Sequence, residues 1–218
     1  MIYATEETEK IKNEVPGLFL EIFDDFYDDI DAVHKFALEC DYERPIVGVY
    51  PGTHSLQQHP DTKRVFDFLA ERLPIDGETS WADLQTTYKF WGRRSVGVFG
   101  LLVDGQNDGV HFHTRAGLWA GVCYLSDARP GEKDGLLLYQ HRETGLYAAR
   151  GTTLEERESY RADGVDRVKW NEIAVIPSRR NRMVLFDGRY FHAASNGYGH
   201  GPHNGRLVQL LGIDFQER

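Results

Sequence analysis

From Trp81 onward the chain alternates short apolar runs with glycine-rich breaks, and this pattern restricts the fold more than any other feature of the sequence. The runs are rich in aromatic and β-branched side chains, which pack well on the pleated surface of a sheet. They read LQTTYKFWG, SVGVFGLLV, LWAGVCYLS, GLLLYQH, IAVIPS, RMVLFDG and RLVQLLGIDF. Short strands with turn signals between them predict an antiparallel sandwich or barrel.

The chain before this region is predicted to lead with helices. Residues 17–23 (GLFLEIF) indicate one short strand. Apolar residues then follow at helical spacing as far as about Cys40, and either Asp28 or Asp29 can cap that helix. A second helix is expected over about residues 60–73, where a proline suits the first turn and the apolar residues share one face.

Two further segments complete this outline. Residues 44–55 contain several prolines and glycines, which predict a loop or irregular extended chain. Residues 153–171 are polar and charge-rich, and they predict one short helix plus a loop inserted between strands. We therefore expect a single domain over residues 1–218, with a helical N-terminal part at about 1–80 and a β-core at about 81–218.

Composition narrows the class of protein. The 25 basic and 34 acidic residues give a net charge of −9, which argues against nucleic acid as a partner because phosphate contacts need cationic residues. No apolar stretch approaches the roughly 20 residues that span a bilayer, so no membrane association is expected. Two cysteines, Cys40 and Cys123, make neither a zinc-like motif nor a disulfide framework. The charged first 16 residues predict no secretory signal, and we expect a cytoplasmic protein.

Histidine and arginine residues at the ends of the predicted strands form the candidate site. His111 and His113 come just before the predicted strand 118–125, and Arg115 follows them. His192 comes just after another strand, and Arg206 opens the last one. Strand ends of a double-sheet barrel can converge on the barrel mouth, where small-molecule sites occur.

These residue types suit one kind of chemistry. Neutral imidazoles bind Fe(II) well. Two of them from distant strands leave positions on the metal for a bidentate oxo-acid and for dioxygen. An arginine 14 residues after His192 can pair with the far carboxylate of that acid, because the guanidinium fork matches carboxylate geometry and keeps its charge.

Several segments together resemble one known family. DDFYDDIDAVHKFAL resembles its opening strand-to-helix passage, the YPG of residues 50–52 follows at the usual place, and residues 119–146 are similar to the segment after the first iron ligands. NRMVLFDGRYFHAA and GRLVQLLGIDF look like the segments that carry the distal histidine and the 2-oxoglutarate arginine. The chain resembles the Fe(II)/2-oxoglutarate-dependent oxygenases, in the prolyl-hydroxylase-like group of small phage and bacterial members, over about residues 18–215.

The resemblance implies a fold, cofactors and roles. The fold would be a mainly β, cupin-like double-stranded β-helix, or jelly roll, with flanking N-terminal helices. The cofactors would be Fe(II), 2-oxoglutarate as co-substrate and O2. His113 and His192, with His111 as a third ligand, would hold the iron, and Arg206 would anchor the C5 carboxylate of 2-oxoglutarate. Tyr124 and Tyr139 lie on core strands from which either can hydrogen-bond a carboxylate, and we assign Tyr124 to the co-substrate.

One departure from the family pattern leaves three interpretations open. The usual His-x-Asp is absent. If the segment is aligned with the family pattern without gaps, His113 is the first ligand and Arg115 stands in the aspartate position. If a two-residue insertion is allowed, His111 is the first ligand and His113 stands in that position. The site is then a three-histidine oxygenase centre, a halogenase in which chloride takes the vacated position near a catalytic Arg115, or a degenerate site in a non-catalytic binding protein. A carboxylate from elsewhere, such as Asp108 or Asp127, is a further alternative. The sequence specifies neither the small-molecule substrate nor the oligomeric state.

Overall fold

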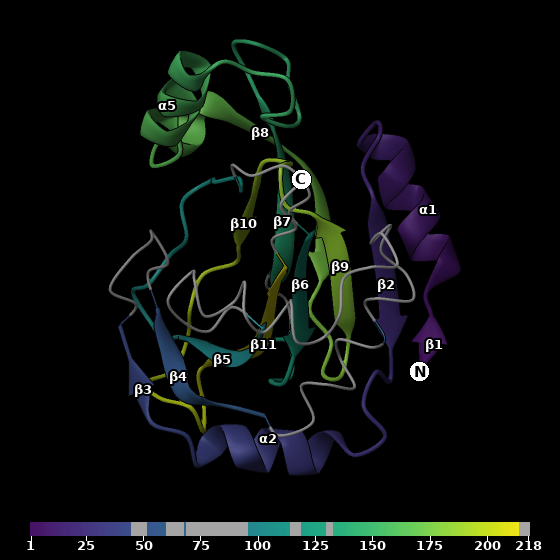
Figure 1. Cartoon of the computed structure of the whole chain (residues 1–218), viewed down its shortest axis with the longest axis vertical. Helices are drawn as coiled ribbons and strands as arrows, with labels where there is room; N and C mark the ends of the chain where they lie inside the picture. The colour runs from purple at the N-terminus through teal and green to yellow at the C-terminus, as the bar shows by residue number, and fades with distance from the viewer. Residues whose placement is uncertain (45–51, 60–67, 69–95, 114–118, 130–132, 214–218) are drawn as a thin grey trace, which may run out of the picture.

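The computed structural model describes residues 1–44, 52–59, 68, 96–113, 119–129 and 133–213 (Figure 1). Within these residues the strands form two antiparallel sheets, a larger one in the order β1-β2-β9-β6-β11-β5-β4-β3 and a smaller one in the order β10-β7-β8. The strands are β1 (Ile2–Tyr3), β2 (Leu20–Asp24), β3 (Tyr42–Glu43), β4 (Thr53–Gln58), β5 (Val96–Leu102), β6 (Trp119–Tyr124), β7 (Gly135–His141), β8 (Trp170–Pro177), β9 (Met183–Asp187), β10 (His192–Ala194) and β11 (Arg206–Ile213). The helices are α1 (Thr5–Glu14), α2 (Ile30–Leu38), α5 (Leu154–Asp163) and the short 3-10 helix η1 (Arg167–Lys169).

Period-two alternation along the central strands builds two layers of core. On β9, Val184 and Phe186 belong to a cluster that also contains Leu138 and Ile176 of the small sheet, so the two sheets pack face to face. Met183 and Leu185 point the other way, into a cluster completed by residues of α2 such as Val33 and Ala37. The large sheet is therefore covered on both faces, with α2 on one side and the small sheet on the other.

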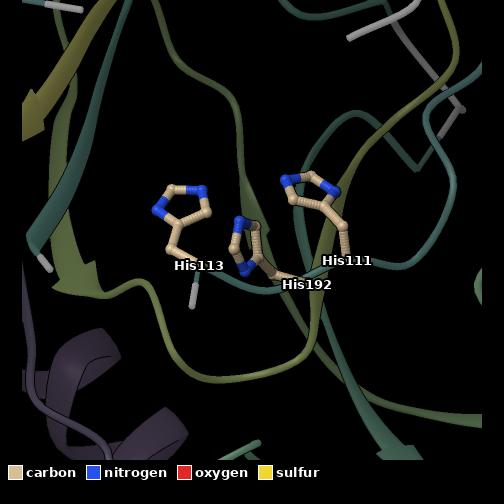
Figure 2. A group of neighbouring side chains, drawn as sticks. All are labelled: His111, His113 and His192. Atoms are coloured by element: carbon tan, nitrogen blue, oxygen red, sulfur yellow. The ribbon is translucent and has the colours of Figure 1, made fainter. Parts of the chain in front are cut away.

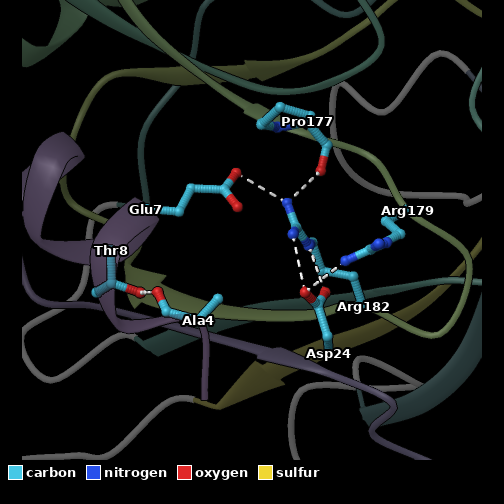
Figure 3. A network of polar contacts seen from close by, with 7 residues as sticks. All are labelled: Ala4, Glu7, Thr8, Asp24, Pro177, Arg179 and Arg182. Carbon is cyan, nitrogen blue, oxygen red and sulfur yellow. Dashed lines mark hydrogen bonds and ion pairs between the residues drawn. The ribbon is translucent and has the colours of Figure 1, made fainter. Parts of the chain in front are cut away.

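An ion-pair network fastens the N-terminal segment to the large sheet (Figure 3). Arg182, which is buried, donates through Nε and Nη2 to the two carboxylate oxygens of Asp24 at 2.7 and 3.1 Å. Its Nη1 donates to Glu7 Oε1 at 2.8 Å and to the carbonyl of Pro177 at 3.1 Å. Arg179 adds a hydrogen bond to Asp24 Oδ2 at 2.9 Å. One guanidinium thus joins α1, β2 and the end of β8.

Most of the predicted elements are present. The runs SVGVFGLLV, LWAGVCYLS, GLLLYQH, IAVIPS, RMVLFDG and RLVQLLGIDF contain β5, β6, β7, β8, β9 and β11. The cap of α2 is Asp29, whose side chain accepts from Ala32 N at 2.9 Å. The inserted segment contains α5, which begins with a capping box between Thr153 and Glu156. The run LQTTYKFWG lies outside the described residues, as does the helix expected over residues 60–73 except for Phe68.

β4 and α1 are the main differences from the sequence prediction. The expected loop over residues 44–55 ends in β4, which pairs with both β3 and β5. Its sequence, THSLQQ, lacks a strong strand pattern, so its conformation is set by its neighbours in the sheet. The polar helix α1 also had no clear signal in the sequence. It is anchored mainly by the buried Ile11 and by the contact of Glu7 with Arg182, and neither contact can be read from a local pattern. The N-terminal part therefore contributes strands to the large sheet as well as helices.

Among the described residues, no helix has the length and apolar character needed to cross a membrane. Cys40 and Cys123 are both free thiols, and burial raises the pKa of the Cys40 thiol to about 11.

Candidate metal centre

Three histidines from two segments meet at one end of the space between the sheets. His111 and His113 lie on the chain that leads towards β6, and His192 is the first residue of β10. The main chains of His111 and His192 form an antiparallel bridge with two N–H to carbonyl hydrogen bonds, each 2.9 Å long. One ligand atom from each of the three side chains lies within 4.8 Å of the others. Figure 2 shows a ring nitrogen of each histidine directed towards the space between the rings.

Main-chain carbonyls orient two of these imidazoles. The Nδ1 of His192 lies 2.7 Å from the carbonyl oxygen of Tyr190, and the Nδ1 of His111 lies 3.0 Å from that of Gly109. A carbonyl only accepts, so each Nδ1 must carry the proton. In the neutral form of each ring, Nε2 is then unprotonated and has a lone pair for a metal.

His113 is held differently. Its main-chain N–H donates to the carbonyl of Gly188 at 2.7 Å. Its Nδ1 is buried and has no hydrogen-bond partner. A Cβ on residue 188 would lie only 2.5 Å from that nitrogen, so a glycine is required behind the ring. A buried imidazole left without a hydrogen bond is costly in a metal-free protein.

Burial keeps the imidazoles of His113 and His192 neutral. Desolvation, together with the neighbouring His111, lowers the pKa of His113 to about 3. Desolvation, together with the neighbouring His111 and His113, lowers the pKa of His192 well below its usual value. Both side chains are therefore uncharged at neutral pH, which is the state that binds metal.

The donor set fits a divalent transition metal such as Fe(II). Three imidazole nitrogens occupy only part of the coordination sphere of such a metal and leave positions for further ligands. Within the described part of the chain, the histidines are joined by no carboxylate at this distance. Asp108 lies near His111, but on the Nδ1 side of the ring at 3.4 Å. Asp127 is exposed, and its main-chain carbonyl accepts from the hydroxyl of Tyr198.

A cavity of about 820 Å³ opens next to the histidines. This volume is within the range of small-molecule sites. Most of its lining is apolar and comes from β6, β11, residues 107–113 and the chain after α5. The described polar and charged side chains that line it are His54, Asn107, Asp108, His111, His113, Tyr124, Arg161, Arg167, His192, Asn196 and Arg206.

Arg206 lies in this cavity, deep in the barrel and only 4% exposed. Its Nε is 3.4 Å from Asp134 Oδ1, and its Nη2 donates to the carbonyl of Gly135 at 3.3 Å. Asp134 also accepts from the hydroxyl of Ser195 at 2.6 Å. The guanidinium carbon lies 5.5 Å from the centre of the Tyr124 ring. The buried cation and Tyr124 are thus adjacent in the same cavity as the histidines.

Tyr124 keeps its proton in this environment. Its hydroxyl is buried, and the Arg206 guanidinium lies next to its ring. Burial raises the pKa of the Tyr124 hydroxyl to about 12, although the Arg206 charge opposes that rise. A buried hydroxyl that keeps its proton can donate to an anionic ligand.

The structure brings together five of the six residues singled out from the sequence. His111, His113 and His192 form one group, and Tyr124 and Arg206 line the same cavity. Arg115 lies outside the described residues. Asp108, offered from the sequence as an alternative carboxylate ligand, lies instead against His111 Nδ1. Sequence reasoning missed Asp134 as the partner of Arg206, and it also missed Gly188 and His54. The Asp-Gly at residues 187–188 was a visible turn signal, but nothing in the sequence placed Gly188 against His113.

Comparisons with known proteins were made for the sequence and for the fold. No family model and no curated protein matches the sequence. HygX from Streptomyces hygroscopicus, solved with nickel and 2-oxoglutarate bound, matches with a TM-score of 0.52 and 13% identity over 95% of this chain and 86% of that one. A Trichoplax adhaerens prolyl hydroxylase, in complex with a hypoxia inducible factor peptide fragment, matches with a TM-score of 0.49 and 11% identity over 96% and 92%. A Pseudomonas putida prolyl-4-hydroxylase gives 0.43 and 14% over 95% and 98%.

HygX binds 2-oxoglutarate in that structure, and 2-oxoglutarate is the co-substrate that the resemblance in the sequence implied. At such low identity the likeness to HygX concerns the fold alone. It confirms the mainly β jelly-roll architecture expected from the sequence.

Proposed function

We propose that the protein is an Fe(II)- and 2-oxoglutarate-dependent oxygenase with a three-histidine iron site. The observation that supports this most is the placement of His111, His113 and His192 beside the buried Arg206 in one cavity of a jelly roll. A divalent metal and a dicarboxylate are the ligands that such a pair of features recognises.

Each residue has a distinct role in the proposal. The Nε2 atoms of His111 and His192 hold iron, since their Nδ1 atoms are occupied by carbonyls. His113 supplies the third nitrogen, in the place where the family pattern has a carboxylate. When bound, iron and 2-oxoglutarate activate O2, yielding succinate and CO2 and oxidising a C–H bond of the substrate.

The inner end of the cavity binds the far carboxylate of 2-oxoglutarate. Arg206 receives that carboxylate with its guanidinium, which must then share or exchange its contact with Asp134. Tyr124 donates its hydroxyl hydrogen to the same carboxylate. The apolar walls exclude water around this charge pair and strengthen it.

The substrate is proposed to be a small molecule, because the cavity is large enough for one beside the co-substrate. Hydroxylation is favoured over halogenation in this proposal. A halogenase leaves the position of the missing carboxylate open for chloride. Here His113 occupies that position, so the three described histidines leave no such opening.

Succinate formation tests the proposal. Purified protein is supplied with Fe(II), 2-oxoglutarate and O2, and succinate is measured without added substrate, when slow uncoupled turnover is expected. His192→Ala should abolish it, whereas His200→Ala, in an exposed loop, should not. The proposal fails if the native protein produces no more succinate than a metal-free control, and a non-catalytic jelly-roll binding protein then becomes the better account.

A further inference from the structure

Asp108 is a buried carboxylate immediately behind the His111 ring. It is 3% exposed. Its Oδ2 accepts from the main-chain N–H of Ala194 at 3.2 Å and lies 3.4 Å from His111 Nδ1. Its Oδ1 is buried and has no hydrogen-bond partner. The same side chain lines the cavity that contains the histidines. A buried charged oxygen without a partner is costly unless another charge compensates it.

Contacts from β10 and η1 hold Asp108 in this position. β10 provides the Ala194 N–H. η1 provides Arg167, which donates through Nη2 to the main-chain carbonyl of Asp108 and through Nη1 to the hydroxyl of Tyr139. The next residues are fixed by a hydrogen bond from Val110 N to the carbonyl of Gly164 at 2.8 Å. The carboxylate is therefore anchored on rigid chain and cannot easily turn away from His111.

The charge balance of the proposed centre explains what this carboxylate does. Three neutral imidazoles leave a bound divalent ion with its full charge of two, whereas a carboxylate ligand would remove one unit. Asp187 is the other described carboxylate that acts on the cluster, through His113. However, both of its oxygens accept from the guanidinium of Arg189. That ion pair largely cancels its charge, so Asp108 remains as the source of compensation.

We propose that Asp108 is a positioning residue that supplies, from behind His111, the negative charge that the three-histidine centre lacks among its direct ligands. It also holds the Nδ1 proton of His111, together with the Gly109 carbonyl, so that Nε2 faces the metal. This inference rests on the proposed metal centre.

Asp108→Asn tests it by removing the charge with little change in shape. Fe(II) affinity, measured anaerobically by titration, should fall by about 10–100-fold, as for other residues that hold a metal-binding histidine. Asp163→Asn is the matched control. Asp163 Oδ2 lies 3.1 Å from Nε2 of His141, a histidine outside the cluster, so the same substitution should leave Fe(II) affinity unchanged there.

A second measurement separates charge from structure. Loss of a nearby negative charge disfavours Fe(III) more than Fe(II), so the reduction potential of the bound iron should rise in Asp108→Asn. A merely structural role would instead lower the Tm of the metal-free protein and leave the potential unchanged. If the asparagine variant does not fold, Asp108→Ser removes the same charge with a smaller side chain and should give the same two shifts.

The outcomes distinguish the two proposals. If the native protein binds Fe(II) but the Asp108 variants bind it within twofold of native affinity, at an unchanged potential, the role of Asp108 is overturned and the metal centre stands. If the native protein binds no Fe(II), the metal centre and the role of Asp108 both fall.

Discussion

Gly188→Ala is a small change that should disable the metal centre. The added Cβ would lie 2.5 Å from His113 Nδ1, where an ordinary contact is at least 3.4 Å, so the ring must move by 3.4 − 2.5 = 0.9 Å. Metal–ligand distances tolerate about 0.2 Å. The main-chain bond from His113 N to the Gly188 carbonyl prevents the two segments from simply separating.

The size of the effect follows from this mismatch. The ring is pushed from its Nδ1 side, so its other nitrogen is displaced from its place in the cluster. We expect Fe(II) affinity to fall at least tenfold, which is about 1.4 kcal/mol. The rearrangement needed to avoid the clash should also lower the free energy of unfolding by about 1–3 kcal/mol.

Anaerobic Fe(II) titration and thermal unfolding measure the two effects. Gly201→Ala is the control, since a Cβ there meets no atom within 4 Å. It should leave the affinity unchanged. The geometry is refuted if Gly188→Ala binds Fe(II) as tightly as the native protein.

Three other changes have defined outcomes. Arg206→Lys keeps the charge but loses the guanidinium fork, so the Kd for 2-oxoglutarate should rise at least tenfold while Fe(II) binding persists; equal weakening of both would contradict the separate roles. Hydrogen bonds from Arg182 lower the pKa of Asp24, so their stabilisation is complete above the unfolded-state pKa near 3.8 and disappears as pH falls through the lower folded value. Asp24→Asn should therefore reduce the free energy of unfolding by about 1–3 kcal/mol at pH 7, with a smaller loss at pH 2 in urea titrations; equal losses would be inconsistent. His113→Asp should retain Fe(II) binding and succinate formation, because its carboxylate takes the place of the His113 ligand. A carboxylate introduced by Arg115→Asp should not be able to take that place; if it does and His113→Asp does not, the ungapped register is correct.

The β-core was predictable because each strand has its own local signal. On β9, for example, alternate residues face two different apolar layers, and the run RMVLFDG is short and bounded by turn residues. β4 and α1 carried no such signal. Their conformations depend on neighbouring strands and on the Arg182 ion pairs, which connect residues more than 150 positions apart.

The candidate site was predictable for residues with distinctive chemistry and not for those that support them. Histidines two apart before a strand, with another at a distant strand end, already indicated a metal site. The sequence left two registers open for His111 and His113, and the structure places both in the cluster. The sequence offered Asp108 only as an alternative carboxylate ligand and gave no role to Asp134, because their roles depend on contacts with His111 and Arg206 across the fold.

Binding of iron and 2-oxoglutarate by the same site is the central claim. The direct measurement is an anaerobic titration of metal-free protein with Fe(II) and then 2-oxoglutarate, followed through the visible metal-to-ligand charge-transfer band. We predict one iron per chain and a band that appears on adding 2-oxoglutarate, absent in His192→Ala. Iron that does not bind, or that binds without producing the band, would contradict the account.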